Sequence, residues 1–133
     1  AEFVTSSNPV NVNAFCDFDG DGDIDIAQWQ ETSAGRMFRN DGKLTFTSMT
    51  NEFTASAAVK GKSMTCADYD GDGDLDLVVG TDSSSVGNKM FRNDGALTFT
   101  AVTNGFTAAS QHPTTFLAWG DYDNVRTRRP CLL

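Results

Sequence analysis

Two stretches of sequence decide the fold: DFDGDGDID at Asp17–Asp25 and DYDGDGDLD at Asp68–Asp76. They differ only at their second and eighth positions. In each stretch aspartate occupies every odd position and glycine occupies the fourth and sixth. Two carboxylates held 4 Å apart repel by about 4 kcal/mol at an effective dielectric constant near 20. Such stretches are therefore expected to fold around a cation.

The sequence around these stretches repeats as well. CDFDGDGDIDIAQW matches ADYDGDGDLDLVVG, RMFRNDGKLTFTSMTNEF matches KMFRNDGALTFTAVTNGF, and a third copy begins with GDYDN at residues 120–124. Asp17, Asp68 and Asp121 are thus equivalent and lie roughly 50 residues apart, a period typical of solenoids, propellers and arrays. In such proteins one unit relies on its neighbours to bury its apolar face. We expect about two and a half units here.

Each unit has the alternating pattern of β-strands. Apolar residues recur at every second position at Ile24 and Ile26; at Leu75, Leu77 and Val79; at Leu44 and Phe46; and at Leu97 and Phe99. The NDG segments 40–42 and 93–95 contain residues that tolerate a positive φ and predict a hairpin turn. Segments such as Met64–Ala67 and Asn51–Phe53 complete roughly four short strands per unit. No segment has the apolar period of a helix, including the Ala-rich stretch 53–59.

The repeats divide the chain into four parts. Residues 1–50 form a partial first unit with its aspartate loop and hairpin, residues 51–103 form the second unit with its loop, and residues 104–124 start a third. The third loop keeps Asp121 and Asp123 but has Val125 and Arg129 at positions 5 and 9, so we expect no calcium there. Residues 125–133 form an atypical basic tail, predicted to be disordered or out of pattern.

The aspartate loops have the composition of a calcium site. Ca²⁺ takes six to eight oxygen ligands at about 2.3–2.6 Å, whereas Mg²⁺ prefers a strict octahedron and retains water. Acids at positions 1, 3, 5 and 9 offer carboxylates, position 7 offers its backbone carbonyl, and the glycines let the chain curl. Two Ca²⁺ sites are predicted, at Asp17, Asp19, Asp21, Asp23 and Asp25, and at Asp68, Asp70, Asp72, Asp74 and Asp76. Solvated acidic turns without a metal are the alternative.

The loops differ from the EF-hand, which also begins D-x-D-x-D-G. An EF-hand ends with a bidentate Glu at position 12, where this chain has Gln28 and Val79. The residues after each loop also alternate like a strand and do not begin a helix. The sequence therefore argues against a helix-loop-helix site.

The charge and the cysteine content limit which partners and which further metal sites the chain could have. The chain has 18 acidic and 10 basic residues, a net charge of −8, which disfavours nucleic acids and anionic membranes as partners. No apolar run reaches the roughly 20 residues needed to span a bilayer, and the first residues lack the features of a signal peptide.

Cys16, Cys66 and Cys131 show no metal-binding spacing. We interpret Cys16 and Cys66 as small buried apolar residues.

The segments ADYDGDGDLDLVVG and KMFRNDGALTFTAVTNGF resemble FG-GAP and VCBS-type repeats, the blades of integrin-α-like β-propellers that also occur in fungal lectins and bacterial surface proteins. The resemblance extends from residue 1 to about residue 124. It implies an all-β fold of consecutive four-stranded antiparallel blades, typically about seven around an axis. It also implies Ca²⁺ held in a hairpin loop. This chain would then form an incomplete ring.

The resemblance implies a recognition or adhesion scaffold, extracellular or at the cell surface, for a protein or carbohydrate partner. Loops on a rigid β framework usually carry the binding residues. A structural role, with self-association through open blade faces, and a non-catalytic part of a larger secreted enzyme are the alternatives. We do not expect an enzyme, because His112 is the single histidine and no free carboxylate pair stands out. Trp29 and Trp119 could stack on a sugar or fill space between blades.

Overall fold

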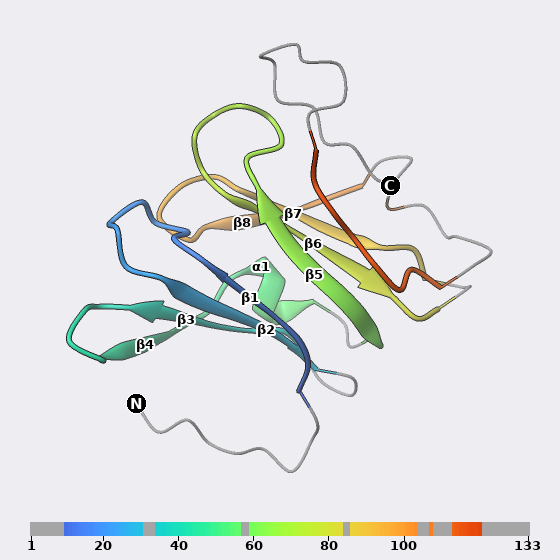
Figure 1. Cartoon of the computed structure of the whole chain (residues 1–133), viewed down its shortest axis with the longest axis horizontal. Helices are drawn as coiled ribbons and strands as arrows, with labels where there is room; N and C mark the ends of the chain where they lie inside the picture. Colours follow the sequence, from blue (N-terminus) through green and yellow to red (C-terminus); the bar gives the residue numbers. More distant parts are fainter. Residues whose placement is uncertain are drawn as a thin grey trace.

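The chain folds into two four-stranded antiparallel sheets (Figure 1). The computed structural model describes residues 10–30, 34–56, 59–83, 86–103, 107 and 113–120. The first sheet contains β1 (Val10–Cys16), β2 (Asp25–Gln30), β3 (Arg36–Asn40) and β4 (Phe46–Met49). The second sheet contains β5 (Gly61–Ala67), β6 (Asp76–Thr81), β7 (Lys89–Asn93) and β8 (Phe99–Val102). This arrangement confirms the predicted all-β class and the four strands per unit.

Both sheets are built in the same way. Each strand pairs with the next one along the chain, and the register shifts at the start of β1, between Val10 and Val12, and of β5, between Gly61 and Ser63. The aspartate loops connect β1 to β2 and β5 to β6. The NDG segments lie in the turns that connect β3 to β4 and β7 to β8. The repeat in sequence is therefore a repeat in structure.

The two hairpin turns are longer than the NDG segments alone. In the first turn Gly42, Lys43 and Leu44 all have positive φ, at 77°, 50° and 62°. Backbone hydrogen bonds from Asp41 N–H to the Thr45 carbonyl and from Thr45 N–H to the Gly42 carbonyl close the loop. The prediction that Leu44 and Leu97 belong to strands is therefore wrong, because both are turn residues. The strands begin two residues later.

One helical turn, α1 (Glu52–Ala55), contradicts the expectation of no helix and of a strand at Asn51–Phe53. Asn51 caps it: its side chain accepts a hydrogen bond from Thr54 N–H, and the Thr54 hydroxyl accepts one from Asn51 N–H. This capping box satisfies the free N–H groups locally and needs no apolar period. Phe53 is fully buried, so a single turn is enough to place one ring in the core.

An apolar core lies between the two sheets, and Trp29 is its largest member. Its ring is fully buried, with the rings of Phe53 and Phe91 at centroid distances of 5.4 and 6.2 Å. The Trp29 indole N–H donates to the Val59 carbonyl at 2.7 Å. Trp29 thus fills the space between the sheets and has no free face for a sugar.

Residues 113–120 cover part of the opposite face of the second sheet. Leu117 forms a small cluster with Val78 and Met90, against which Trp119 packs. Thr114 N–H donates to the Thr81 carbonyl at 2.9 Å. The second sheet is therefore packed on both faces.

A disulfide joins Cys16 at the end of β1 to Cys66 in β5, and these two strands lie side by side (Figure 1). The interpretation of both residues as free buried cysteines is therefore wrong. The two cysteines are not equivalent in the repeat, since Cys16 directly precedes Asp17 whereas one residue separates Cys66 from Asp68. Only the packing of β1 against β5 brings them together.

The predictions for the third loop, the basic tail, His112 and Cys131 lie outside the described residues. Within the described ranges, none of the helical structure is long and apolar enough to cross a bilayer.

Candidate metal centre

Both aspartate loops lie at the same end of the molecule as the two hairpin turns (Figure 1). The loop glycines have positive φ: 74° and 95° at Gly20 and Gly22, and 83° and 104° at Gly71 and Gly73. A Cβ at these glycines would meet no atom within 4 Å. Glycine is therefore favoured here by the backbone conformation and not by lack of space.

The first aspartate of each loop organises the backbone. Asp17 Oδ1 accepts a hydrogen bond from Gly20 N–H at 2.8 Å, and Asp17 Oδ2 accepts one from Gly22 N–H at 3.0 Å. Asp68 makes the equivalent bonds at 2.7 and 3.2 Å. Since an ionised carboxylate has about four acceptor sites, it can accept these bonds and still bind a cation.

The third and fifth positions continue this pattern. Asp19 accepts from Asp21 N–H at 3.3 Å, and Asp21 accepts from Asp23 N–H at 2.8 Å. The second loop repeats both bonds, at 3.4 and 2.9 Å. The pKa of Asp19 is raised, first by partial burial and further by the charges of Asp21 and Asp17. The neighbouring carboxylates of the folded loop thus repel one another and disfavour the ionised form of Asp19.

Each loop brings three carboxylates together. Among the described residues, oxygens of Asp17, Asp19 and Asp21 lie within 4.8 Å of one another, as do oxygens of Asp68, Asp70 and Asp76. Two oxygens that share one Ca²⁺ are at most about 5 Å apart, given Ca–O distances of 2.3–2.6 Å. The gathered oxygens therefore fit a calcium ion. Asp25 and Asp72 do not belong to these groups.

The side chain at position 7 lies against the neighbouring turn. A Cβ built on Gly42 would lie 3.2 Å from Asp23 Oδ2, and one on Gly95 would lie 3.4 Å from Asp74 Oδ2. These carboxylates therefore face the NDG turns. This placement is compatible with the predicted role of position 7, which assigns its backbone carbonyl to the metal.

The aspartate at position 9 is fully buried in both loops. Asp25 accepts from Phe18 N–H at 2.9 Å and from Asn40 N–H at 2.8 Å, and Asp76 accepts from Tyr69 and Asn93 N–H, each at 2.8 Å. Burial nevertheless raises the pKa of both carboxyls, that of Asp76 to about 6. A cation beside these groups would favour their ionised form.

Sequence reasoning missed the asparagines of the NDG turns as parts of the site. Asn40 donates through its backbone N–H to Asp25, through Nδ2 to the Ile24 carbonyl at 3.2 Å, and accepts from Gly42 N–H at 3.1 Å. Asn93 makes the same three bonds in the second sheet. The motif MFRNDG in both copies contains this signal, but the pattern alone indicates only that the asparagine belongs to a turn.

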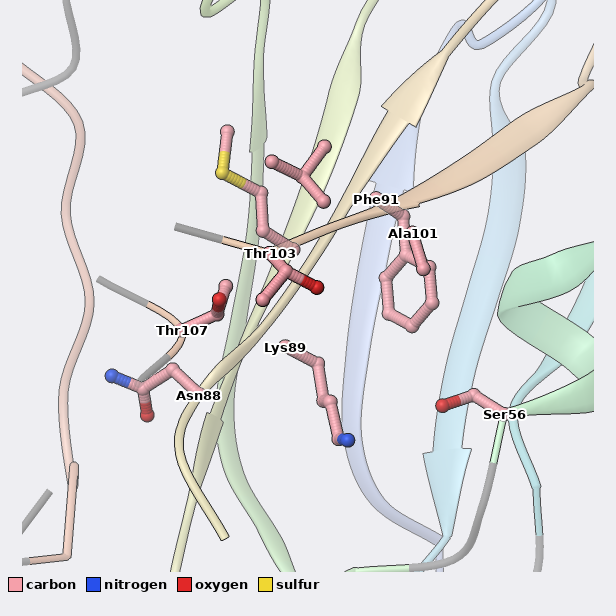
Figure 2. Close-up of a pocket in the computed structure, with 9 residues that line it drawn as sticks. Ser56, Asn88, Lys89, Phe91, Ala101, Thr103 and Thr107 are labelled. Atoms are coloured by element: carbon pink, nitrogen blue, oxygen red, sulfur yellow. The ribbon is translucent and has the colours of Figure 1, made fainter. Parts of the chain in front are cut away.

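A cavity of about 250 Å³ lies away from the loops, near the starting end of β7 (Figure 2). Lys89, Phe91, Ala101 and Thr103 line it, together with Ser56 at the end of α1. In Figure 2 Lys89 lies between Ser56 on one side and Asn88 and Thr107 on the other. The lining of the cavity thus offers hydroxyl groups and the ammonium group of Lys89.

Comparison with known families supports the repeat. Residues 17–79 and 68–124 each match the FG-GAP-like repeat. Each match begins at an aspartate loop and continues into or through the next one, so the two matches overlap and cover most of the chain. Among curated proteins, none matches the chain significantly.

Proposed function

The chain belongs to the FG-GAP-like repeat family, and on this premise we propose that it is a calcium-binding segment of a β-propeller that serves as an extracellular recognition or adhesion scaffold. The observation that carries the proposal is the pair of loops that each gather three carboxylate oxygens within 4.8 Å. The groups use positions 1, 3 and 5 in the first loop and positions 1, 3 and 9 in the second. Because two loops at equivalent places in the repeat each gather carboxylates, a selected metal site is favoured over incidental acidic turns.

In this proposal the loop residues hold Ca²⁺ through the carboxylates at positions 1, 3, 5 and 9 and the carbonyl at position 7. The bound cation would offset part of the negative charge of the carboxylates and allow each loop to close. The chain's own contribution is the backbone arrangement, in which Asp17 and Asp68 fix the glycine N–H groups. The role of the ion in this proposal is structural.

The partner in this proposal is a protein or a carbohydrate. The net charge of −8 disfavours nucleic acids and anionic lipid. Loops on a rigid sheet are suited to recognition, and the cavity beside Lys89 offers polar groups for a ligand. The Cys16–Cys66 disulfide supports placement outside the cytosol, because disulfides persist in oxidising compartments.

A second candidate function is assembly through the open face of the first sheet. Leu44 is 92% exposed and Phe15 is 62% exposed there. The equivalent face of the second sheet is covered by the first sheet, which suggests that another unit of the same kind suits the open face. A protein mass that rises with concentration, without ligand binding, would favour assembly, whereas binding on a glycan array would favour recognition.

The metal site is tested by calorimetric titration with Ca²⁺ and by thermal melting with and without it. We expect two bound ions and a large calcium-dependent rise in melting temperature. The double variant Asp68→Ala/Asp72→Ala should lose one ion and part of the rise. The control Asp41→Ala/Asp94→Ala removes the same charge from the hairpin turns and should keep both ions. A wild-type protein that binds no Ca²⁺ at millimolar concentration would refute the proposal.

A further inference from the structure

Asn93 makes one contact that its counterpart Asn40 lacks within the described part of the chain. Its side-chain Nδ2 donates to the carbonyl of Phe18 at 2.7 Å. Phe18 lies in the first aspartate loop, between Asp17 and Asp19, so this hydrogen bond crosses from the second sheet to the first. Asn93 is fully buried. The bond is therefore shielded from water, where a lost partner is costly.

The contact completes a chain of hydrogen bonds between the two loops. Phe18 N–H donates to Asp25, which is position 9 of the first loop. Asn93 N–H donates to Asp76, which is position 9 of the second loop. Asn93 Nδ2 also lies 3.3 Å from the Leu75 carbonyl. Two residues, Phe18 and Asn93, thus connect the buried carboxylates of both loops.

Side-chain packing also holds Phe18 against the second sheet. The Phe18 ring is buried and meets the ring of Phe99 in β8 edge-on, with centroids 5.8 Å apart. Phe18 therefore cannot shift without disturbing both its ring contact and its hydrogen bond to Asn93. The conformation of the first loop and the position of Asn93 depend on each other.

We propose that Asn93 couples the two aspartate loops, so that Ca²⁺ bound in one loop raises the affinity of the other. The proposal rests on the calcium-binding function proposed above. An ion bound by Asp17 and Asp19 fixes the Phe18 peptide between them and hence the acceptor for Asn93. A fixed Asn93 in turn holds Asp76 in place. The second ion then binds a loop whose ordering cost is already reduced.

The coupling is reciprocal by thermodynamic linkage. One buried hydrogen bond contributes on the order of 1 kcal/mol, which corresponds to a roughly three- to tenfold change in affinity. We expect a factor of this size in both directions.

The test is a set of Ca²⁺ titrations by calorimetry on the full chain. Asp19→Asn disables the first loop and Asp70→Asn disables the second, each at an exposed or half-buried position where the change disturbs the backbone little. With the first loop disabled, the second loop should bind Ca²⁺ several-fold more weakly than it does in the wild-type protein with the first loop filled. The reciprocal loss is expected in Asp70→Asn.

Asn93→Ala should abolish this dependence, leaving the two loops independent. Asn40→Ala is the matched control, because it removes the same contacts within one sheet but none between the sheets; coupling should persist. Repulsion between the two bound ions is the same in both variants and cancels from the comparison. Coupling that survives Asn93→Ala, or is lost equally in Asn40→Ala, would overturn the proposal.

A second measurement covers the case in which Asn93→Ala does not fold. In Asp19→Asn protein, Ca²⁺ fills only the second loop, and hydrogen exchange of the Phe18 amide should slow several-fold if the loops are coupled. Unchanged exchange would overturn the proposal. Two ions bound independently in the wild-type protein would refute the coupling but leave calcium binding intact, whereas no bound ion would refute both.

Discussion

The two sheets have nearly the same sequence pattern and hydrogen bonds but very different surroundings. Leu44 in the first sheet's turn is 92% exposed, whereas its counterpart Leu97 is 2% exposed. Ile26 and Gln28 of β2 are half-buried, whereas Leu77 and Val79 at the same positions of β6 are fully buried. The first sheet covers this face of the second sheet, while among the described residues nothing comparable covers the first.

The comparison separates the structural features that a unit forms by itself from those that depend on the neighbouring unit. Strand register, turn shape and the loop hydrogen bonds are alike in both units because each depends on contacts within the unit. Burial differs because it requires an adjacent sheet. Four predictions, from the largest expected effect to the smallest, test this distinction.

The largest contrast is expected between Leu97→Ala and Leu44→Ala. Both residues have the same left-handed turn conformation, with φ of 61° and 62°, so backbone strain is matched. Leu97→Ala leaves a cavity in the core and should destabilise the protein by about 2–5 kcal/mol. Leu44→Ala should change stability by less than about 0.5 kcal/mol. Urea unfolding measures both, and similar losses would mean that the first sheet's face is also covered in solution.

Removal of the disulfide by Cys16→Ser/Cys66→Ser should cost about 2–4 kcal/mol, since the bridge closes a loop with a sequence separation of 50. Hydrogen exchange should increase more in β1–β4 than in β5–β8. Both sheets lose the same covalent link, but the second sheet keeps the packing of residues 113–120 on its other face. Equal increases in both sheets would contradict this asymmetry.

The buried position-9 carboxyls predict an unusual pH dependence without metal. The folded-state pKa of Asp76 is about 6, above its ordinary value of 3.8, so the folded protein binds the proton more tightly. Its contribution to stability is present below about pH 4 and is lost as pH rises through 6, by up to about 3 kcal/mol. Calcium should offset this loss at neutral pH.

Thermal melting between pH 4 and 7 measures this dependence. Asp76→Asn should flatten the profile of the metal-free protein. Asp25→Asn should flatten it less, because the described residues cover only one face of the first sheet. A metal-free protein that becomes more stable across this range would contradict the prediction.

The smallest effect concerns Arg39 and Arg92, which pair with Asp41 and Asp94 beside the loops. The charge of Arg39 also interacts with Asp19 and Asp21. Arg39→Gln should raise calcium affinity in the first loop by at most a few-fold, and Arg92→Gln should do the same in the second. Lys62→Gln, whose partner is Asp82, should have no effect. The gains should vanish at high salt, because the charges are exposed.

Much of the site was predictable because its pattern is local. Alternation of aspartate and glycine indicated a curled acidic loop, and the positive φ values of the loop glycines agree with that interpretation. The role of Asn40 and Asn93 was not predictable, because it depends on how the hairpin turn lies against the loop. The helical turn at Glu52–Ala55 was missed because one capped turn leaves no periodic signal.

By itself the sequence determined the repeat, most of the strands, the places of the turns and the acidic loops, since each of these follows from preferences of residues a few positions apart. Only the tertiary structure decided that Cys16 pairs with Cys66, that Leu97 is buried while Leu44 is not, and that Asn93 reaches Phe18. Each of these depends on which surfaces of two similar sheets meet. A sequence repeat specifies the surfaces but not their partners, so contacts between distant residues appear only when the sheets pack.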